Sequence, residues 1–212
     1  MSVTRFLDWF QLAGLAFLVC LAVPRMVRLY ARGIHVLAID RQRTPGQMLE
    51  DLLAGISLVL WWYELVAYAW PLSLHLVPAR LGRVLFDAVV LKVTGAALMA
   101  AGLVIYGLAL TVFRDSWRLG IDRKTPGPLV TGGIFTWTRN PIYVGFDLMI
   151  VGTLLIQGRL IFLVLAVVFV GMLHLLILRE ERFLSEKYGD AYQNYRARVG
   201  RYITWPSTRS RA

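Results

Sequence analysis

The chain has little of what marks a soluble, secreted or metal-dependent protein. It contains one cysteine in 212 residues, so no intrachain disulfide framework is available. Only 17% of its residues are charged, whereas an average soluble domain carries about 25%. It has no metal-ligand cluster, no Gly-x-Gly-x-x-Gly fingerprint and no serine-nucleophile motif. These absences argue against a disulfide scaffold, a metal site, and nucleotide binding or hydrolysis of the familiar soluble kinds.

Long apolar runs are what the chain has instead. Hydrophobic residues make up 58% of it, and the mean hydropathy is +0.60. A bilayer core of about 30 Å requires about 20 predominantly apolar residues per helix. The candidate spans are residues 6–23, 49–70, 84–113, 142–156 and 160–178. We therefore predict an all-α, polytopic membrane protein with five transmembrane helices, folded as a single membrane domain over residues 1–212.

The last two spans are predicted to form a helical hairpin. Only residues 157–159 separate them, and the fourth run has just 15 residues, which requires shared depth or local thinning of the bilayer. The first run could be a cleaved signal peptide or a retained helix. We favour a retained helix, because the positive charge of Arg5 is offset by Asp8 and no small-residue cleavage pattern precedes Pro24. Cys20 lies inside this run, where we expect a buried structural thiol.

The basic residues predict an orientation. Eighteen of the 23 lysines and arginines fall in residues 24–48, 114–139 and 179–212, whereas the alternate loops carry four. This bias predicts an outside N-terminus and a cytoplasmic C-terminus. Membrane topology and anionic lipid headgroups then account for the +10 net charge, with no nucleic-acid partner. The 20 arginines against 3 lysines suggest a GC-rich bacterial source, and hence a bacterial inner membrane.

Two polar clusters flank the predicted hairpin. The first is Thr138-Arg139-Asn140-Pro141-Ile142-Tyr143-Val144-Gly145. The second is Arg179-Glu180-Glu181, followed by Leu184, Tyr188-Gly189, Tyr192 and Tyr195. A hairpin that crosses the bilayer and turns back returns the second cluster to the face where the first began. The loop charges put both on the cytoplasmic side, which suits a water-soluble cofactor meeting a lipophilic substrate.

This region resembles the integral-membrane methyltransferase superfamily, which includes isoprenylcysteine carboxyl methyltransferases and phospholipid N-methyltransferases. The family pattern is Leu-Val-Thr-x-Gly-Pro-Phe/Tyr, then Arg-His-Pro-x-Tyr-x-Gly, a hairpin, and Glu-Glu-x-x-Leu-x-x-x-Phe/Tyr-Gly-x-x-Tyr-x-x-Tyr. The corresponding stretches here are Leu129-Val130-Thr131-Gly132-Gly133-Ile134-Phe135, Arg139-Asn140-Pro141-Ile142-Tyr143-Val144-Gly145, and Glu180-Glu181-Arg182-Phe183-Leu184 through Tyr188-Gly189, Tyr192 and Tyr195. The likeness covers about residues 116–202. It implies an enzyme that transfers a methyl group from S-adenosylmethionine to a lipophilic acceptor.

Two positions depart from the family pattern. Ile134 stands in place of the usual proline, and Asn140 in place of the usual histidine. Asparagine donates and accepts hydrogen bonds but does not titrate near neutral pH. A proton-accepting role of the family histidine is therefore absent here, whereas a positioning role can be kept. We favour positioning.

The chemistry of the cofactor suggests where it binds. The free amides at the start of the fourth span, after Pro141, suit a carboxylate. A glutamate at a helix end can accept from ribose hydroxyls or an ammonium. The resemblance implies that one of Glu180 and Glu181 contacts the cofactor or orients the acceptor, and we favour Glu181. The cofactor-binding candidates are Gly132, Gly133, Phe135, Asn140, Pro141, Ile142, Tyr143, Glu180 and Glu181. The catalytic candidates are Glu181, Arg179 and Arg139. Arg139 or Arg179 can hold a carboxylate or phosphate of the substrate through a bidentate contact.

Ionisable residues also occur inside the spans. Such residues usually face a cavity or a partner, so Asp147 and His174 are expected to border the substrate cavity. His174 lies seven positions before Glu181 and hence on the same helical face. For Glu64 and Lys92 we expect a structural ion pair between the second and third spans.

Each candidate also has a structural interpretation. The arginines can anchor the ends of spans, the two glutamates can be a solvated helix face, Tyr143 can belong to an aromatic belt, and Gly132-Gly133 can be an ordinary turn. Three functions therefore stay open: the methyltransferase, an NADPH-dependent sterol-type membrane reductase with a similar C-terminal signature, and a non-catalytic membrane scaffold. The acceptor can be an isoprenoid-linked carboxylate, a phospholipid amine or a hydrophobic thiol.

The spans and the signature motifs divide the single membrane domain into two regions. Residues 1–115 hold three spans and their loops, and residues 116–204 form the cofactor-binding signature region with its hairpin. From Glu181 onward, the spacing of apolar and aromatic residues predicts an amphipathic helix interrupted at Gly189, lying against the membrane surface or over the cofactor chamber. Residues 205–212 are predicted to be a disordered tail. The sequence leaves the oligomeric state open.

Overall fold

The computed structural model describes residues 3–33, 44–70, 72–113 and 127–204. Over these ranges the regular structure is helical, which confirms the predicted all-α class. The helices are α1 (Val3–Ala31), α2 (Pro45–Ala69), α3 (Val89–Phe113), α4 (Pro141–Gln157), α5 (Leu160–Tyr188) and α6 (Asp190–Arg198), with 3-10 turns η1 (Ala79–Gly82) and η3 (Gly133–Thr136). Within the described residues, four helices (α1, α2, α3 and α5) are long and apolar enough to cross a membrane. The chain is a multi-pass membrane protein, and the crossing by the 17-residue α4 stays a prediction.

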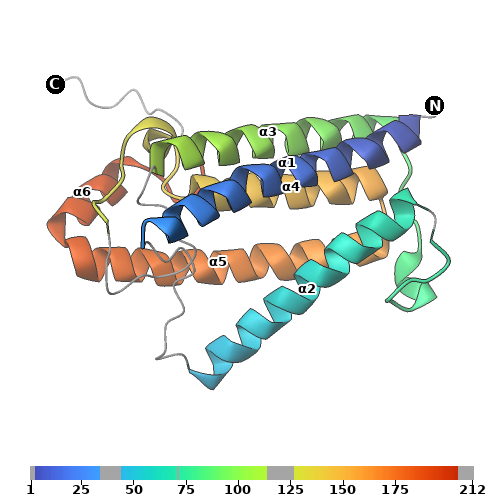
Figure 1. Ribbon diagram of the computed structural model, residues 1–212, viewed down its shortest axis with the longest axis horizontal. Helices are drawn as coiled ribbons and strands as arrows, with labels where there is room; N and C mark the ends of the chain where they lie inside the picture. Colours follow the sequence, from blue (N-terminus) through green and yellow to red (C-terminus); the bar gives the residue numbers. More distant parts are fainter. Residues whose placement is uncertain (1–2, 34–43, 71, 114–126, 205–212) are drawn as a thin grey trace.

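The helices form a bundle in which α1, α3 and α4 run side by side, α5 returns along them, and α2 crosses obliquely (Figure 1). The core between them is built from large apolar side chains of α1, α2, α3, α4 and α5, among them Leu15, Trp61, Leu65, Met99, Met149 and Phe162. At the far end of α5 the chain turns at Gly189 into α6, which folds back beside it. This end of the bundle carries the polar clusters.

A seam of facing glycines joins α3 to α4. A Cβ atom on Gly102 would lie 2.5 Å from the carbonyl oxygen of Gly145, and one on Gly95 would lie 2.6 Å from that of Gly152. The glycines are spaced seven residues apart on each helix, so both pairs fall on one stripe of an antiparallel contact. Because side chains are absent there, the two backbones approach closely, as small residues allow in membrane helices. The seam holds the start of α4 in a defined place.

Some expected boundaries were wrong. The first helix continues through Pro24 to Ala31 rather than ending near residue 23. The third begins at Val89, not at Val84, because the backbone before it bonds to the hairpin turn instead: the amides of Leu85 and Phe86 donate to the carbonyl of Gly158 at 2.7 and 3.3 Å. Gly158 has a positive φ of 60° and ends α4, as the predicted hairpin requires.

The expected pair between Glu64 and Lys92 is also wrong. Glu64 contacts the segment after α2, bonding to His75 Nδ1 at 2.8 Å and to the amide of Leu76 at 2.9 Å. Lys92 pairs with Asp87 and donates to the Thr4 hydroxyl at 3.4 Å. The two side chains therefore face different neighbours.

The expected burial of Cys20 is wrong as well. This free thiol is exposed on α1, because α1 packs against the bundle through only part of its circumference. The predicted tail over residues 205–212 lies outside the described residues.

Candidate functional site

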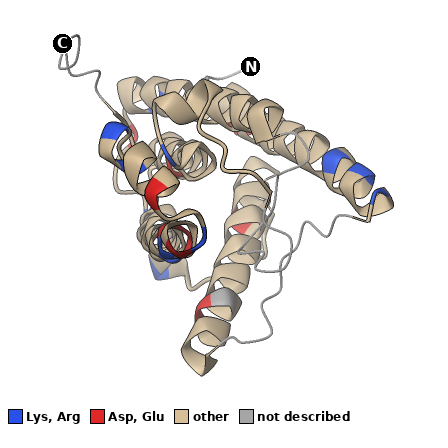
Figure 2. Cartoon of the chain, turned by 90° about the vertical axis from the view of Figure 1, so that its left-hand side faces the viewer, with Lys and Arg blue, Asp and Glu red and all other residues tan. Residues whose placement is uncertain are grey.

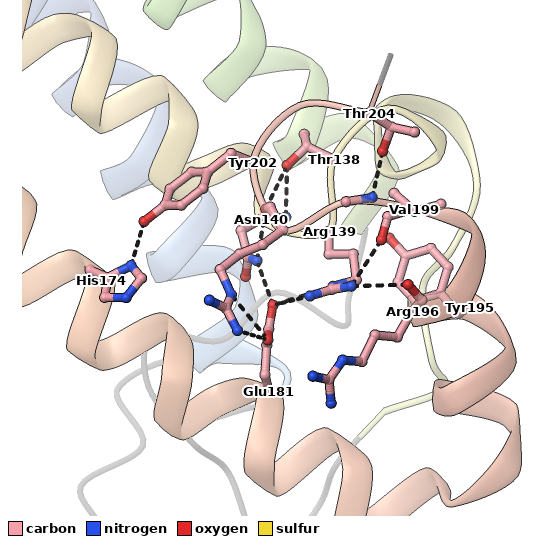
Figure 3. Close-up of polar contacts among 12 residues, drawn as sticks. Thr138, Arg139, Asn140, His174, Glu181, Tyr195, Arg196, Val199, Tyr202 and Thr204 are labelled. Atoms are coloured by element: carbon pink, nitrogen blue, oxygen red, sulfur yellow. Dashed lines mark hydrogen bonds and ion pairs between the residues drawn. The ribbon is translucent and has the colours of Figure 1, made fainter. Parts of the chain in front are cut away.

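The hairpin of α4 and α5 brings the two polar clusters together at one end of the bundle. Figure 2, which faces that end, shows charged residues of both signs on α5 and α6. Glu181, near the end of α5, lies against Arg139 and Asn140, which come just before α4 (Figure 3). Their separation of 41 to 42 residues in the sequence is closed by the antiparallel return of α5.

The Glu181 carboxylate is held by three side chains. Its Oε1 accepts from Arg139 Nη2 at 2.7 Å and Nε at 3.2 Å, and from Asn140 Nδ2 at 3.3 Å. Its Oε2 accepts from Arg201 Nη2 at 2.9 Å and Nε at 3.2 Å. With the carboxylate buried, these charge-assisted forks are strong and directional. Both oxygens of Glu181 are thus engaged by the protein itself.

Residues 199–204, which we call the C-terminal strap, are tied to the loop before α4 through backbone bonds. The amide of Arg139 donates to the carbonyl of Gly200 at 3.0 Å, and the amide of Thr204 donates to that of Trp137 at 2.7 Å. The carbonyl of Arg201 accepts from the Thr138 hydroxyl at 3.1 Å and from Asn140 Nδ2 at 3.0 Å. The strap therefore lies across the start of α4 and delivers its own side chains to the site (Figure 3).

The site carries excess positive charge. Two guanidinium groups, of Arg139 and Arg201, share the single negative charge of Glu181. Hydrogen bonding to Glu181 raises the pKa of Arg201 above its usual value, so this arginine stays charged. Burial raises the pKa of the nearby Tyr192 phenol to about 12, so the phenol is neutral. An anionic group is the ligand that this balance favours.

The three consecutive residues 179–181 contact three different parts of the protein. Arg179 pairs with Glu50 near the start of α2. Glu180 accepts from the Tyr143 hydroxyl at 2.7 Å, and this contact aligns α4 with α5. Glu181 binds the loop before α4 and the strap. Arg179 and Glu181, both catalytic candidates, therefore point into separate interactions.

His174 is brought to the strap rather than to Glu181. Its Nδ1 lies 2.6 Å from the hydroxyl of Tyr202, and the two rings are stacked with centroids 6.1 Å apart. Burial raises the pKa of the Tyr202 phenol, and the charge of Asp147 raises it further, while Arg201 opposes both. His174 therefore contacts Tyr202 directly, Asp147 influences it through its charge, and a substrate cavity at these two residues stays a prediction.

The residues of the loop before α4 have structural reasons for their identity. Gly133 has a φ of +60°, and a Cβ there would lie 2.7 Å from Val112 Cγ2, so both backbone and packing require glycine. Gly132 faces open space. Phe135 is buried against Phe113, and its carbonyl accepts from the Tyr195 hydroxyl at 2.7 Å.

The first turn of α4 is buried. Pro141 and Ile142 occupy it, and Asn140 precedes it without capping it through its side chain. The Asn140 side chain is instead directed to Glu181 and the strap. The amide of Asn140 thus connects Glu181 to the strap, and the expected positioning role of this residue stays a prediction.

Sequence reasoning missed the two strap side chains, Arg201 and Tyr202. They follow the last motif residue, and Arg201 contacts a carboxylate 20 positions earlier. The only signal was an arginine-tyrosine pair directly after Gly200 at the end of a helical pattern.

Comparisons with known proteins agree with this architecture. The family model for phospholipid methyltransferases matches residues 90–191, which include α3, the hairpin and the start of α6. The protein-S-isoprenylcysteine O-methyltransferase of Schizosaccharomyces pombe is 36% identical over 72 residues, a match that covers 34% of this chain and 30% of that protein. The chain thus spans less than a third of the length of this relative. Both matches show that the chain is similar to integral-membrane methyltransferases, and the phospholipid methyltransferase model covers the hairpin of α4 and α5.

Proposed function

We propose that this protein transfers a methyl group from S-adenosylmethionine to a lipophilic acceptor at the cytoplasmic face of the membrane. The observation that carries the proposal is the meeting of Arg139, Asn140 and Glu181 at one end of an apolar hairpin. A site at the mouth of lipid-embedded helices is accessible to a water-soluble cofactor from one side and to an acceptor from the bilayer. When bound, S-adenosylmethionine supplies a sulfonium methyl group for direct displacement.

The residues present fit this cofactor. Its amino-acid end carries a carboxylate, and the cluster offers two guanidinium groups against one glutamate. The amides in the first turn of α4 lie at the positive end of that helix and suit the same group. In this proposal Arg139 and Arg201 bind the carboxylate, while Glu181 holds both arginines in place and acts on the cofactor through them.

The other candidates take complementary roles in the proposal. Tyr143 and Glu180, joined across the hairpin at 2.7 Å, flank the adenosine and accept from its ribose hydroxyls. Gly132, which faces open space, allows a ligand to approach the backbone of η3. Displacement needs the nucleophile, methyl carbon and sulfur in line, so positioning is the main contribution of these side chains.

The test uses the full chain, purified and returned to lipid, with methyl-labelled S-adenosylmethionine. Equilibrium binding is measured first; label extracted into organic solvent after incubation with native lipid then reports transfer. We expect saturable binding and extractable label. Binding of NADPH in place of S-adenosylmethionine would support the reductase, and binding of neither would support a scaffold.

A matched pair of variants locates the cofactor. Arg201→Gln removes a guanidinium from the cluster, whereas Arg198→Gln removes an exposed one that bonds only to its own helix, at the carbonyl of Asn194. We expect the first to weaken S-adenosylmethionine binding by about tenfold or more, as loss of a charged hydrogen bond does, and the second to leave it unchanged. Equal effects of the two would exclude the cluster as the binding site.

A further inference from the structure

Asp147 presents a buried carboxylate oxygen that the fold leaves without a partner. Within the described residues, its Oδ1 is inaccessible to solvent and accepts no hydrogen bond. Glu64, Glu180 and Glu181 are also buried or half-buried acids in the bundle, and each of them has donors. A carboxylate inside a membrane protein is costly without a partner and commonly marks a functional position.

The position of Asp147 follows from the register of the hairpin. Tyr143 contacts Glu180 across α4 and α5, and Asp147 lies four residues further along the same face of α4. One helical turn places it about 6 Å deeper in the bundle, and His174 lies about 9 Å deeper than Glu180 on the antiparallel α5. The two side chains thus come to nearly the same depth, below the cluster around Glu181.

One residue of the strap, Tyr202, is close enough to this position to feel its charge. Tyr202 bonds to His174 at 2.6 Å and lies within the field of Asp147. Because its phenol is neutral, its hydroxyl can donate to His174 Nδ1 and keep an oxygen lone pair free. The guanidinium of Arg201, the residue before Tyr202, donates to Glu181 through Nε and Nη2. Tyr202 can therefore accept a hydrogen bond beside Asp147, whereas the proposed function assigns Arg201 to Glu181 and the cofactor carboxylate.

We propose that Asp147, together with the Tyr202–His174 pair, binds the headgroup of the methyl acceptor and selects a protonated amine over a carboxylate. The inference rests on the proposed function and narrows its acceptor. An ammonium donates to Asp147 and to the phenol oxygen of Tyr202, and it neutralises the buried charge. A carboxylate would be repelled by the like charge of Asp147. A long alkyl chain attached to the amine extends into the apolar interior.

The same arrangement handles the proton that an amine must lose. The ammonium transfers one proton to the Asp147 carboxylate, which becomes neutral. The freed nitrogen lone pair then forms a bond to the methyl carbon as the carbon–sulfur bond breaks, with its electron pair left on sulfur. The methylated ammonium leaves, and Asp147 returns its proton to water. A carboxylate acceptor, already ionised, would need none of this.

The test compares two ligands of equal chain length, dodecylamine and dodecanoate. Their binding to the full chain in phosphatidylcholine nanodiscs at pH 7 is measured by calorimetry. We expect dodecylamine to bind more tightly than dodecanoate. Asp147→Asn should weaken the binding of dodecylamine by about tenfold or more and leave the binding of dodecanoate unchanged or tighter. Asp190→Asn, at the exposed start of α6, is the matched control and should alter neither ligand. Tighter binding of dodecanoate, or equal losses in both variants, would overturn the proposal.

Two further measurements keep the result interpretable. Asp147→Glu retains the charge, so it should recover amine binding if Asp147→Asn fails to fold; no recovery in a folded Glu variant would count against the site. S-adenosylmethionine binding is measured on the same samples and should survive Asp147→Asn. Failure of the wild-type chain to bind this cofactor would overturn the proposed function. The preference for the amine is tested independently by the calorimetry with dodecylamine and dodecanoate. Label transferred to phosphatidylethanolamine in place of dodecylamine would identify a phospholipid headgroup as the source of the amine.

Discussion

Two buried glutamates at opposite ends of the bundle satisfy their charge in different ways. Glu64, on the last turns of α2, is fully buried and accepts from His75 and from the amide of Leu76. Glu181, near the end of α5, is 6% exposed and is held by Arg139, Asn140 and Arg201. Both are costly to bury alone, and both have donors on each carboxylate oxygen.

The difference lies in what each glutamate joins. Glu64 contacts residues 11 and 12 positions later, so it shapes one local turn after α2. Glu181 contacts residues 42 positions earlier and 20 positions later, so it joins the loop before α4 to the strap. A buried acid with local partners stabilises one segment, whereas one with distant partners assembles a site. The two should therefore respond differently to substitution.

The largest effect is expected for Glu181→Ala. This change leaves the guanidinium groups of Arg139 and Arg201 partly buried without their counter-charge, and breaking such a buried pair costs about 3–5 kcal/mol. Thermal unfolding in detergent, followed by tryptophan fluorescence, should show the loss, and S-adenosylmethionine binding should disappear with it. A variant as stable as wild type would show that the strap is held by other contacts.

A smaller effect is expected for Glu64→Ala. It leaves the amide of Leu76 and the ring of His75 without their acceptor, which costs about 1–3 kcal/mol. The same unfolding measurement should record a lower midpoint, but cofactor affinity should be unchanged because the site lies at the other end of the bundle. Loss of affinity in a folded Glu64→Ala sample would mean that the two ends are coupled.

The smallest effect is expected for Tyr143→Phe. It removes one hydroxyl that donates to Glu180 at 2.7 Å, and an intramolecular hydrogen bond contributes about 0.5–1.5 kcal/mol. The ring stays in place, so the hairpin should keep its register. Adenosine competition against labelled S-adenosylmethionine checks whether Tyr143 flanks the nucleoside. If the substitution leaves competition unaltered, Tyr143 acts on helix alignment alone.

The sequence predicted the part of the structure that follows from run length and charge spacing. Two apolar runs joined by Gln157-Gly158-Arg159 predict a hairpin, and a hairpin requires the residues before Pro141 to meet those after Leu178. The contact of Arg139 with Glu181 confirms this geometry.

The remaining features depend on helix rotation and backbone bonds, which leave no pattern in a single sequence. Glu64 and Lys92 both lie inside predicted spans, but the direction that each side chain faces is set by packing, so the expected pair was wrong. The strap is held largely by carbonyl and amide groups that every residue carries. Arg201 and Tyr202 were therefore invisible as site residues until the chain was folded. The continuation of α1 through Pro24 likewise reflects local context that overrides a helix-breaking residue.

The glycine seam between α3 and α4 has a consequence for how the sequence can vary. At Gly102 and Gly95 the atom that an added methyl group would approach most closely is a backbone oxygen of the facing helix. The facing residues, Gly145 and Gly152, have no side chain that a substitution could make smaller. No exchange at these two positions of α4 can therefore make space for the added methyl group. A genetic screen for suppressors of Gly102→Ala should therefore recover true revertants or changes elsewhere in the bundle, and never a smaller residue at the facing position.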